Sequence, residues 1–408
     1  MNTVPRATLS PTRAPSGRGI RYALFAVAAV GAAALGVAGY LLLQPTPPTV
    51  AAAAGPGRFG GIEVGAKGVK PILMDFLKTP AGYEFDVPSL TDDELKDVNT
   101  DLGTPAAGSD KAFDSARVDA TARAIEKFRK RLAEHHKLPP ERIVVVVSSG
   151  VFSGIAADAA GAARTALAAR LAEANGGREP RFITTTQEGE YAAIGVIPKD
   201  RRAKSLLIDI GSGNMRVGRF AADGFRVAGV EYGTTKLQRE AAKKAADTNR
   251  PYAAVLAEIG ESGVARPLRE KLAADTGVVT ATEAHLVGGA AWAMATFALP
   301  GRVLDKDVRT PITPADLERF AALIALPPDA ARAKALEGVT DPAVKVAAEA
   351  ELQRVQKVFN PEQLAAAAVL LRAVAAEARL ADKSVVFFRK GQYAWIAGCL
   401  IEAAGLRD

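Results

Sequence analysis

Residues 204–220 read KSLLIDIGSGNMRVGRF. An apolar run leads into Asp209, a Gly-rich turn follows, and an alternating apolar pattern resumes at Met215. This order predicts a strand, a turn that is large enough to surround a phosphate group, and a second strand. Glycines in such a turn let backbone N–H groups approach an oxyanion, and Asp209 at the strand end can hold a metal ion or orient a water. A buried hairpin that binds no ligand would give the same pattern.

A second stretch of the same kind lies upstream. Residues 59–76, FGGIEVGAKGVKPILMDF, place Glu63 at the end of an apolar strand, before a turn from Gly65 to Gly68 and another apolar strand. Two such acid–Gly hairpins predict a duplicated phosphate-binding fold, in which each half grips one side of a phosphoanhydride.

Strands and helices alternate between and after the hairpins, which is typical of the α/β class. The expected helices are residues 90–98, 112–136, 156–174, 188–196, 235–248, 252–272 and 393–404, with a helical region from 313 onward. The expected strands are residues 141–147, 181–184, 278–279 and 384–388, with another that ends at 287–289. The class is therefore α/β.

Composition sets limits on the function. With 408 residues, 49% of them hydrophobic, the chain is long enough for two domains with cores. The net charge of +7, to which the N-terminal arginines contribute, suits an anionic substrate. The sequence contains no zinc-finger or RNA-binding signature, so the positive charge does not imply a nucleic-acid partner. The single cysteine, Cys399, excludes an intrachain disulfide and is predicted to be a buried helix residue. Only three histidines argue against a histidine metal site.

The N-terminal region predicts attachment to a membrane. Residues 1–19 are expected to be a disordered basic leader, residues 20–43 a transmembrane helix with an uncharged core at 22–43, and residues 44–57 a Pro/Ala linker. A cleaved signal peptide is the alternative, because small residues follow at 51–54, but the length of the apolar stretch favours an anchor. Arginines before the helix place the N-terminus in the cytoplasm and the globular part outside it.

Several motifs resemble those of the exopolyphosphatase and guanosine pentaphosphate phosphatase family, a branch of the actin, Hsp70 and sugar-kinase superfold. Asp209, Gly211 and Gly213 resemble its Asp-x-Gly-Gly-Gly-Ser-Thr-Glu motif, and Glu188 is similar in position to its catalytic glutamate. Weaker matches are GTTKL at 233–237, LVGGAA at 286–291 and FRKG at 388–391. The resemblance implies a two-lobed, actin-like (ribonuclease H-like) duplicated fold with a cleft between a first lobe, 58–198, and a second, 199–408.

The resemblance also implies a site. It makes Glu188 and Asp209 catalytic, and lets Glu63 and Asp209 hold Mg²⁺ or Mn²⁺. The residues expected to bind phosphate are Gly65, Lys67, Gly211, Ser212, Gly213, Asn214, Arg216 and Lys236. Without the resemblance, a helix dipole explains Glu188 at a helix start almost as well, and lone lysines are usually just solvated.

The chain departs from the family motifs. Glu63-Val-Gly-Ala-Lys67 stands where the family has Asp-x-Gly-Ser-Asn, and Arg216 replaces the glutamate that ends the second motif. Phe152 and Glu190 stand where the family has arginines. Arg216 would repel a divalent cation, so Lys67 and Arg216 are expected to face each other and clamp a phosphate directly, unless both point to solvent.

Two function classes follow. The first is a membrane-anchored, exopolyphosphatase-like phosphohydrolase that cleaves phosphoanhydride bonds of polyphosphate or a related polyanion. The second is a catalytically inactive sensor or scaffold that binds polyphosphate or a nucleotide, and an actin-like assembly platform at the membrane is a weaker third. The sequence leaves open the chain length of the substrate, the metal and the oligomeric state, a homodimer included.

Overall fold

The computed structural model describes residues 57–79, 82–87, 96–305 and 308–406. The predicted leader and transmembrane helix, and the linker up to residue 56, lie outside these ranges. No helix in the described part of the chain combines the length and the hydropathy of a membrane-spanning segment.

The first lobe is built on a mixed sheet. Its strands are β1 (Gly57–Val64), β2 (Gly68–Thr79), β3 (Gly82–Asp86), β4 (Val98–Asn99), β5 (Ile143–Val147) and β6 (Arg181–Phe182). The predicted hairpin of β1 and β2 is antiparallel, whereas β5 pairs with β1 in parallel. The strand order is β3-β2-β1-β5-β6, and β4 pairs with β2.

The second lobe repeats this topology. Its strands are β7 (Ser205–Ile210), β8 (Met215–Ala221), β9 (Gly224–Val230), β10 (Glu283–Val287), β11 (Arg309–Ile312) and β12 (Ser384–Phe388). Three antiparallel strands, β9-β8-β7, are followed by parallel β10 and β12 in the same order as in the first sheet, and β11 is added at the far edge. The predicted duplication is confirmed.

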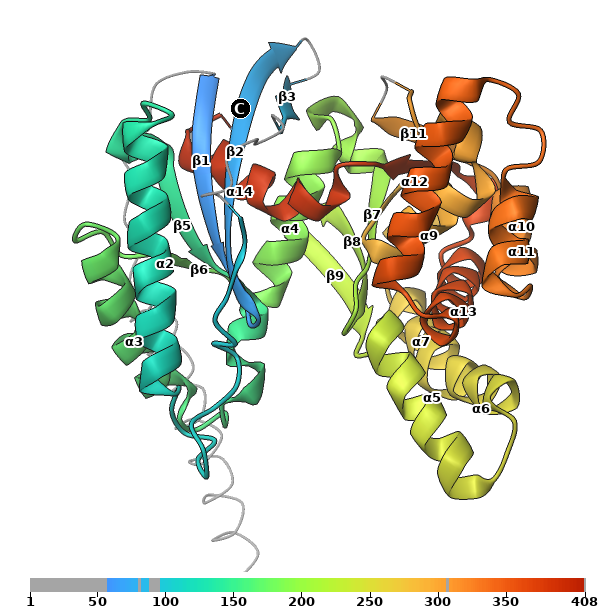
Figure 1. Cartoon of the computed structure of the whole chain (residues 1–408), viewed down its shortest axis with the longest axis horizontal. Coiled ribbons are helices and arrows are strands. Elements are labelled where there is room, and N and C mark those ends of the chain that lie inside the picture. Colours follow the sequence, from blue (N-terminus) through green and yellow to red (C-terminus); the bar gives the residue numbers. More distant parts are fainter. Residues whose placement is uncertain (1–56, 80–81, 88–95, 306–307, 407–408) are drawn as a thin grey trace, which may run out of the picture. The chain divides into compact units, whose positions relative to one another are not determined.

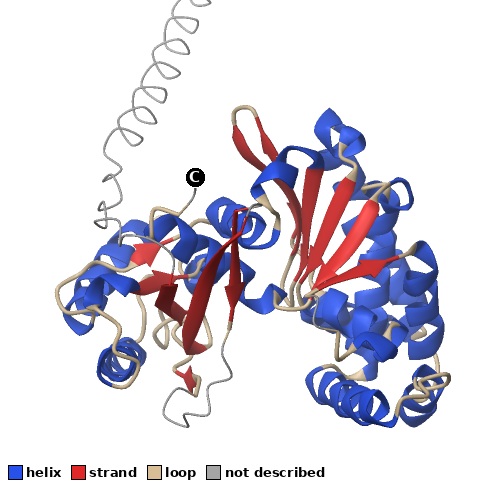
Figure 2. Cartoon of the chain, turned by 90° about the horizontal axis from the view of Figure 1, so that it is seen from above, coloured by secondary structure: helices blue, strands red, loops and turns tan. Residues whose placement is uncertain are grey.

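Helices cover both sheets (Figures 1 and 2). In the first half they are α2 (Ser115–Glu134), α3 (Ala160–Ala174) and α4 (Thr185–Val196). In the second half they are α5 (Thr234–Thr248), α6 (Tyr252–Ile259), α7 (Arg266–Ala273), α8 (Thr276–Thr280), α9 (Gly289–Ala298), α10 (Pro314–Ile324), α11 (Pro328–Ala335), α12 (Pro342–Val358), α13 (Pro361–Glu377) and α14 (Ala394–Ala403). The α/β class is therefore confirmed.

Helix α14 carries the chain back to the first lobe. It packs on α4, and Ile396 and Leu400 share one buried cluster with Phe59 and Met74 of the first sheet. Helix α14 therefore packs with the first lobe, although the predicted boundary at 198/199 assigns its residues to the second lobe. Cys399 lies buried in this helix, as predicted, and burial raises the pKa of its thiol to about 12.

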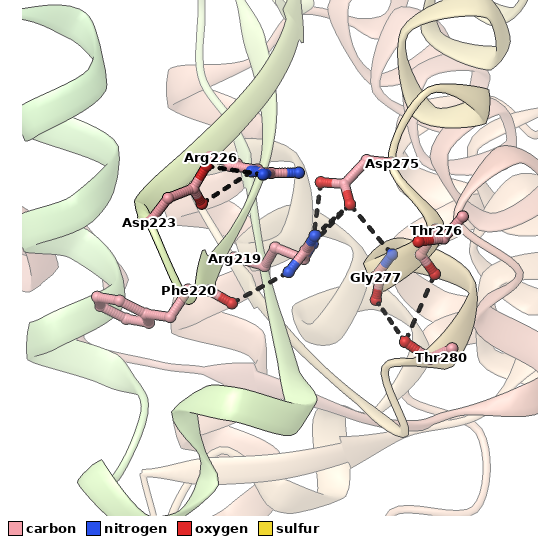
Figure 3. A network of polar contacts seen from close by, with 8 residues as sticks. All are labelled: Arg219, Phe220, Asp223, Arg226, Asp275, Thr276, Gly277 and Thr280. Carbon is pink, nitrogen blue, oxygen red and sulfur yellow. Dashed lines mark hydrogen bonds and ion pairs between the residues drawn. The ribbon is translucent and has the colours of Figure 1, made fainter.

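The strand expected at 278–279 is wrong, because this segment is helix α8. The Asp275 carboxylate accepts a hydrogen bond from the Gly277 N–H at 3.0 Å, which begins a helical turn (Figure 3). Arg219 holds Asp275 in place through an ion pair. This cap overrides the strand propensity of the two valines, of which Val279 is 51% exposed.

Other differences are smaller. Of the helix expected at 90–98, residues 90–95 lie outside the described residues, and Val98 belongs to β4 instead. The helix expected at 252–272 is present as α6 and α7, joined by a π-helical turn, Gly260–Ala265. Strands β3 and β11 were not expected.

Candidate functional site

The first residues of α5 hydrogen-bond to the turn between β7 and β8 and fix its position. The Gly211 carbonyl accepts from Thr234 N–H at 3.0 Å, and the Ser212 carbonyl accepts from the N–H groups of Thr235 and Lys236 at 3.0 and 3.1 Å. In a trans peptide the carbonyl and the next N–H point in opposite directions. The N–H groups of Ser212 and Gly213 therefore face away from α5, and neither has an acceptor within the described residues.

The turn between β1 and β2 uses the same arrangement. The Ala66 carbonyl accepts from Gly103 N–H at 2.8 Å, and the Lys67 carbonyl accepts from Thr100 and Asp101 N–H at 2.9 Å. The Lys67 N–H consequently points away from residues 100–103. Both turns thus present backbone donors of the kind that bind oxyanions.

Each turn packs against a glycine of another segment, and the two backbones lie too close together for a side chain at that position. A Cβ on Gly233 would lie 2.4 Å from the Gly211 carbonyl oxygen. A Cβ on Gly103 would lie 2.6 Å from the Ala66 Cβ. These contacts explain the glycine of the GTTKL motif and reveal a counterpart in the first lobe that the sequence analysis missed.

Each hairpin pairs its acid with a cation directly across the ladder. Asp209 lies opposite Arg216, and Glu63 lies opposite Lys70. The distances are 3.8 Å from Arg216 Nη1 to Asp209 Oδ2 and 3.9 Å from Lys70 Nζ to Glu63 Oε2. The structural counterpart of Arg216 is therefore Lys70, and the correspondence expected between Lys67 and Arg216 is wrong. Counting outward from the two turns would have shown this register.

Glu188 lies in the first turn of α4. Thr184 caps this helix and forms a capping box with Gln187, which fixes the helix start just before Glu188. The Ser149 hydroxyl donates to Glu188 Oε2 at 2.5 Å, and Arg216 Nη2 lies 3.7 Å from the same oxygen. Ser149 was missed by the sequence analysis. Its signal is the Ser-Ser pair directly after β5, because parallel strands end at one edge of a sheet and bring their following residues together.

The three carboxylates and their cations form one electrostatic cluster. Burial raises the pKa of Asp209 above its usual range, Arg216 lowers it and the Glu188 charge raises it. Burial likewise raises the pKa of Glu63, Lys70 lowers it and Glu188 raises it. Arg216 links Glu188 and Asp209 directly, through contacts of 3.7 and 3.8 Å.

The positive charge of Arg216 disfavours a divalent cation at these residues. Within the described ranges no three His, Cys, Asp or Glu side chains come together as metal ligands. The Arg216 guanidinium lies between Asp209 and Glu188, and unit charges at about 4 Å repel by roughly 4 kcal/mol near a protein surface. Mg²⁺ or Mn²⁺ at Glu63 and Asp209 stays a prediction, which the titration below tests.

The other predicted residues lie around this cluster. Gly65, Gly211 and Asn214 are partly buried in the turns, whereas Ser212 and Gly213 are exposed. Lys67 is exposed on the first turn, and Lys236 is exposed beside the ring of Tyr232, 5.6 Å from its centre. Gly288, in the LVGGAA motif, packs against Asp209, since a Cβ there would lie 2.7 Å from Asp209 Oδ1. Thus Glu188, Asp209 and Arg216 come together, Glu63 is paired with Lys70, and Lys67 and Lys236 lie at the surface.

Comparison with known proteins supports the fold. No protein-family model and no curated protein matches the sequence. A solved Ppx/GppA phosphatase from Aquifex aeolicus, in its type II variant, is 16% identical and superposes with a TM-score of 0.53 over 83% of this chain and 98% of the phosphatase. An exopolyphosphatase from Cytophaga hutchinsonii is 13% identical, with a TM-score of 0.50 over 83% of this chain and 97% of that protein. The chain therefore has the two-lobed α/β fold of these phosphatases, and its resemblance to the exopolyphosphatase and guanosine pentaphosphate phosphatase family is confirmed at the level of the fold.

Proposed function

We propose that the chain binds the end of a polyphosphate-like polyanion at the two turns and hydrolyses its terminal phosphoanhydride bond. One observation carries this proposal. Two hairpins of the same topology present outward N–H donors, and Arg216 of the second hairpin lies within ion-pair distance of both Asp209 and Glu188. Phosphoryl transfer needs this combination, because its catalysis depends mainly on positioning and on stabilising charge.

Glu188 is the proposed general base. It accepts a proton from a water whose oxygen bonds to the terminal phosphorus, while the bond from that phosphorus to the bridging oxygen breaks. The leaving oxygen keeps the electron pair, and the products are orthophosphate and a chain shorter by one phosphate. The Ser149 hydroxyl, 2.5 Å from Glu188 Oε2, orients the carboxylate, and Arg216 with the N–H groups of Ser212 and Gly213 stabilises the phosphate charge.

The second candidate is a sensor that binds the polyanion without cleaving it. The observation in its favour is the contact of Arg216 with Glu188 at 3.7 Å. A guanidinium at this distance competes with an attacking water for the Glu188 carboxylate. The two candidates differ in turnover alone and share one binding site.

A phosphate-release assay separates them. The purified full chain in detergent is incubated with long-chain polyphosphate, with tripolyphosphate and with a phosphomonoester, each with and without Mg²⁺. We expect orthophosphate from the first two and none from the monoester. Binding without release would support the sensor, and neither binding nor release would contradict both candidates.

Membrane anchoring by residues 20–43 is part of the proposal, with the N-terminus in the cytoplasm and the catalytic part outside it. The support is the uncharged stretch at 22–43 and the arginines that precede it. Protease added to intact cells, or to spheroplasts where an outer barrier exists, should digest the globular part. Protection equal to that of a cytosolic marker would reverse the topology.

A further inference from the structure

We infer that Arg216, supported by Lys70, is a fixed cation that takes the place of a divalent metal, so that phosphoanhydride binding at this site needs no Mg²⁺ or Mn²⁺. This inference rests on the proposed function, because it assumes that the two turns bind a phosphate chain. It adds the source of positive charge and a metal-independent mode of binding.

The first observation is the register of the hairpins. Each acid that could bind a metal has a cation directly across the ladder, Glu63 with Lys70 and Asp209 with Arg216. Residues directly opposite in an antiparallel pair project from the same face of the sheet, so the pairing follows from the backbone and does not require a chance rotamer. The same acid–cation arrangement occurs in both halves of a duplicated fold.

The second observation is the environment of Arg216. The residue is only 9% exposed, and its Nε is buried without a hydrogen-bond partner among the described residues. Its two terminal nitrogens lie 3.7 and 3.8 Å from Glu188 and Asp209, which is ion-pair range but longer than a hydrogen bond. A guanidinium carries five N–H donors and matches phosphate geometry bidentately, so these donors are not saturated.

These observations define how the site recognises its ligand. The phosphate meets the Arg216 guanidinium and the N–H groups of Ser212 and Gly213 as direct partners. Charge and hydrogen bonds then come from groups that the fold holds in place, whereas a metal site would have to be loaded first. Lys70 has a smaller part, because its side chain is 38% exposed.

Two titrations of the full chain test the inference, and neither depends on turnover. In the first, free Mn²⁺ is followed by electron paramagnetic resonance as protein is added. The wild type should leave the signal unchanged, whereas Arg216→Glu, which places a third carboxylate beside Glu188 and Asp209, should remove about one equivalent of Mn²⁺. Lys78→Glu makes the same charge change at an exposed position of β2 and should behave as the wild type.

The second titration measures tripolyphosphate affinity by calorimetry in EDTA and in Mg²⁺. Wild type and Lys78→Glu should bind in EDTA, and the ratio of their affinities should be the same in both buffers. Arg216→Gln, which keeps a side chain of similar polarity and avoids extra negative charge, should bind about 10- to 100-fold more weakly in EDTA. Lys70→Gln should weaken tripolyphosphate binding in EDTA less than Arg216→Gln does. If Arg216→Glu does not fold, the calorimetric titration of the glutamine variants still tests the inference.

The outcomes separate this inference from the proposed function. A wild-type chain that removes Mn²⁺ stoichiometrically, or that binds tripolyphosphate only when a divalent ion is present, would overturn the fixed cation and leave the proposed function standing. A wild-type chain that binds tripolyphosphate under neither condition would contradict the proposed function as well. Affinity in EDTA that is unchanged by Arg216→Gln would also overturn the inference.

Discussion

Glu188→Gln is expected to lower the rate of orthophosphate release by about 10²- to 10⁴-fold, because an amide cannot take a proton from the attacking water. The fold should be unaffected, since the glutamine oxygen can still accept the hydrogen bond from the Ser149 hydroxyl. Tripolyphosphate binding should also persist, because Arg216 and the turn N–H groups are left in place. Initial rates on polyphosphate at saturating substrate measure the effect.

Two further variants show whether the loss of rate is specific to the Glu188 carboxylate. Glu190→Gln changes a carboxylate on the same helix, α4, and should keep the wild-type rate. Ser149→Ala removes only the hydrogen bond that orients Glu188 and should cost less than Glu188→Gln, with the loss in kcat and little change in KM. Wild-type rates in Glu188→Gln would remove Glu188 from the mechanism.

Gly398→Ala is expected to lower the free energy of unfolding by roughly 3 kcal/mol or more. Helices α4 and α14 cross so closely that a Cβ on Gly398 would lie 1.9 Å from the Tyr191 carbonyl oxygen. On the facing helix, a Cβ on Gly195 would lie 2.2 Å from the Ala394 carbonyl oxygen. Both obstacles are backbone atoms inside helices, so the methyl group fits only if the helices separate and the core beneath α14 opens.

Urea unfolding followed by tryptophan fluorescence measures this change, since Trp395 lies on α14 itself. Gly161→Ala is the matched control, because a Cβ there meets nothing within 4 Å and alanine favours a helix by about 0.5 to 1 kcal/mol. An unchanged midpoint in Gly398→Ala would show that the crossing is looser than described.

The duplicated hairpins were predictable because their signals are local. An apolar run, an acid, small turn residues and a resumed alternation lie within each of residues 59–76 and 204–220, and the structure has strands and turns there. Strands β3 and β11 were missed because they have only five and four residues, and because β11 contains a proline, which a strand tolerates at the edge of a sheet. Helix α8 was missed because its start depends on Asp275, whose position is fixed by Arg219 from a distant strand.

The site was predictable only in part. The change of charge at Arg216 is visible in the sequence, but the burial that places it between two carboxylates is a tertiary property. The place of Lys67 in the turn suggests it as the partner of Arg216, whereas the hydrogen-bond ladder puts Lys70 at the position that corresponds to Arg216. Ser149 reaches Glu188 from the segment after β5, and the Ser-Ser pair at that strand end is the one sequence signal for the contact.

A crystal structure of the Glu188→Gln chain with tripolyphosphate bound, and without divalent metal, would show directly how the site holds phosphate. We expect a terminal phosphate within hydrogen-bond distance of the Arg216 guanidinium and of the N–H groups of Ser212 and Gly213, with its phosphorus facing residue 188. A phosphate chain bound away from both turns, or density at the turns only when a metal ion is added between residues 63 and 209, would contradict this expectation.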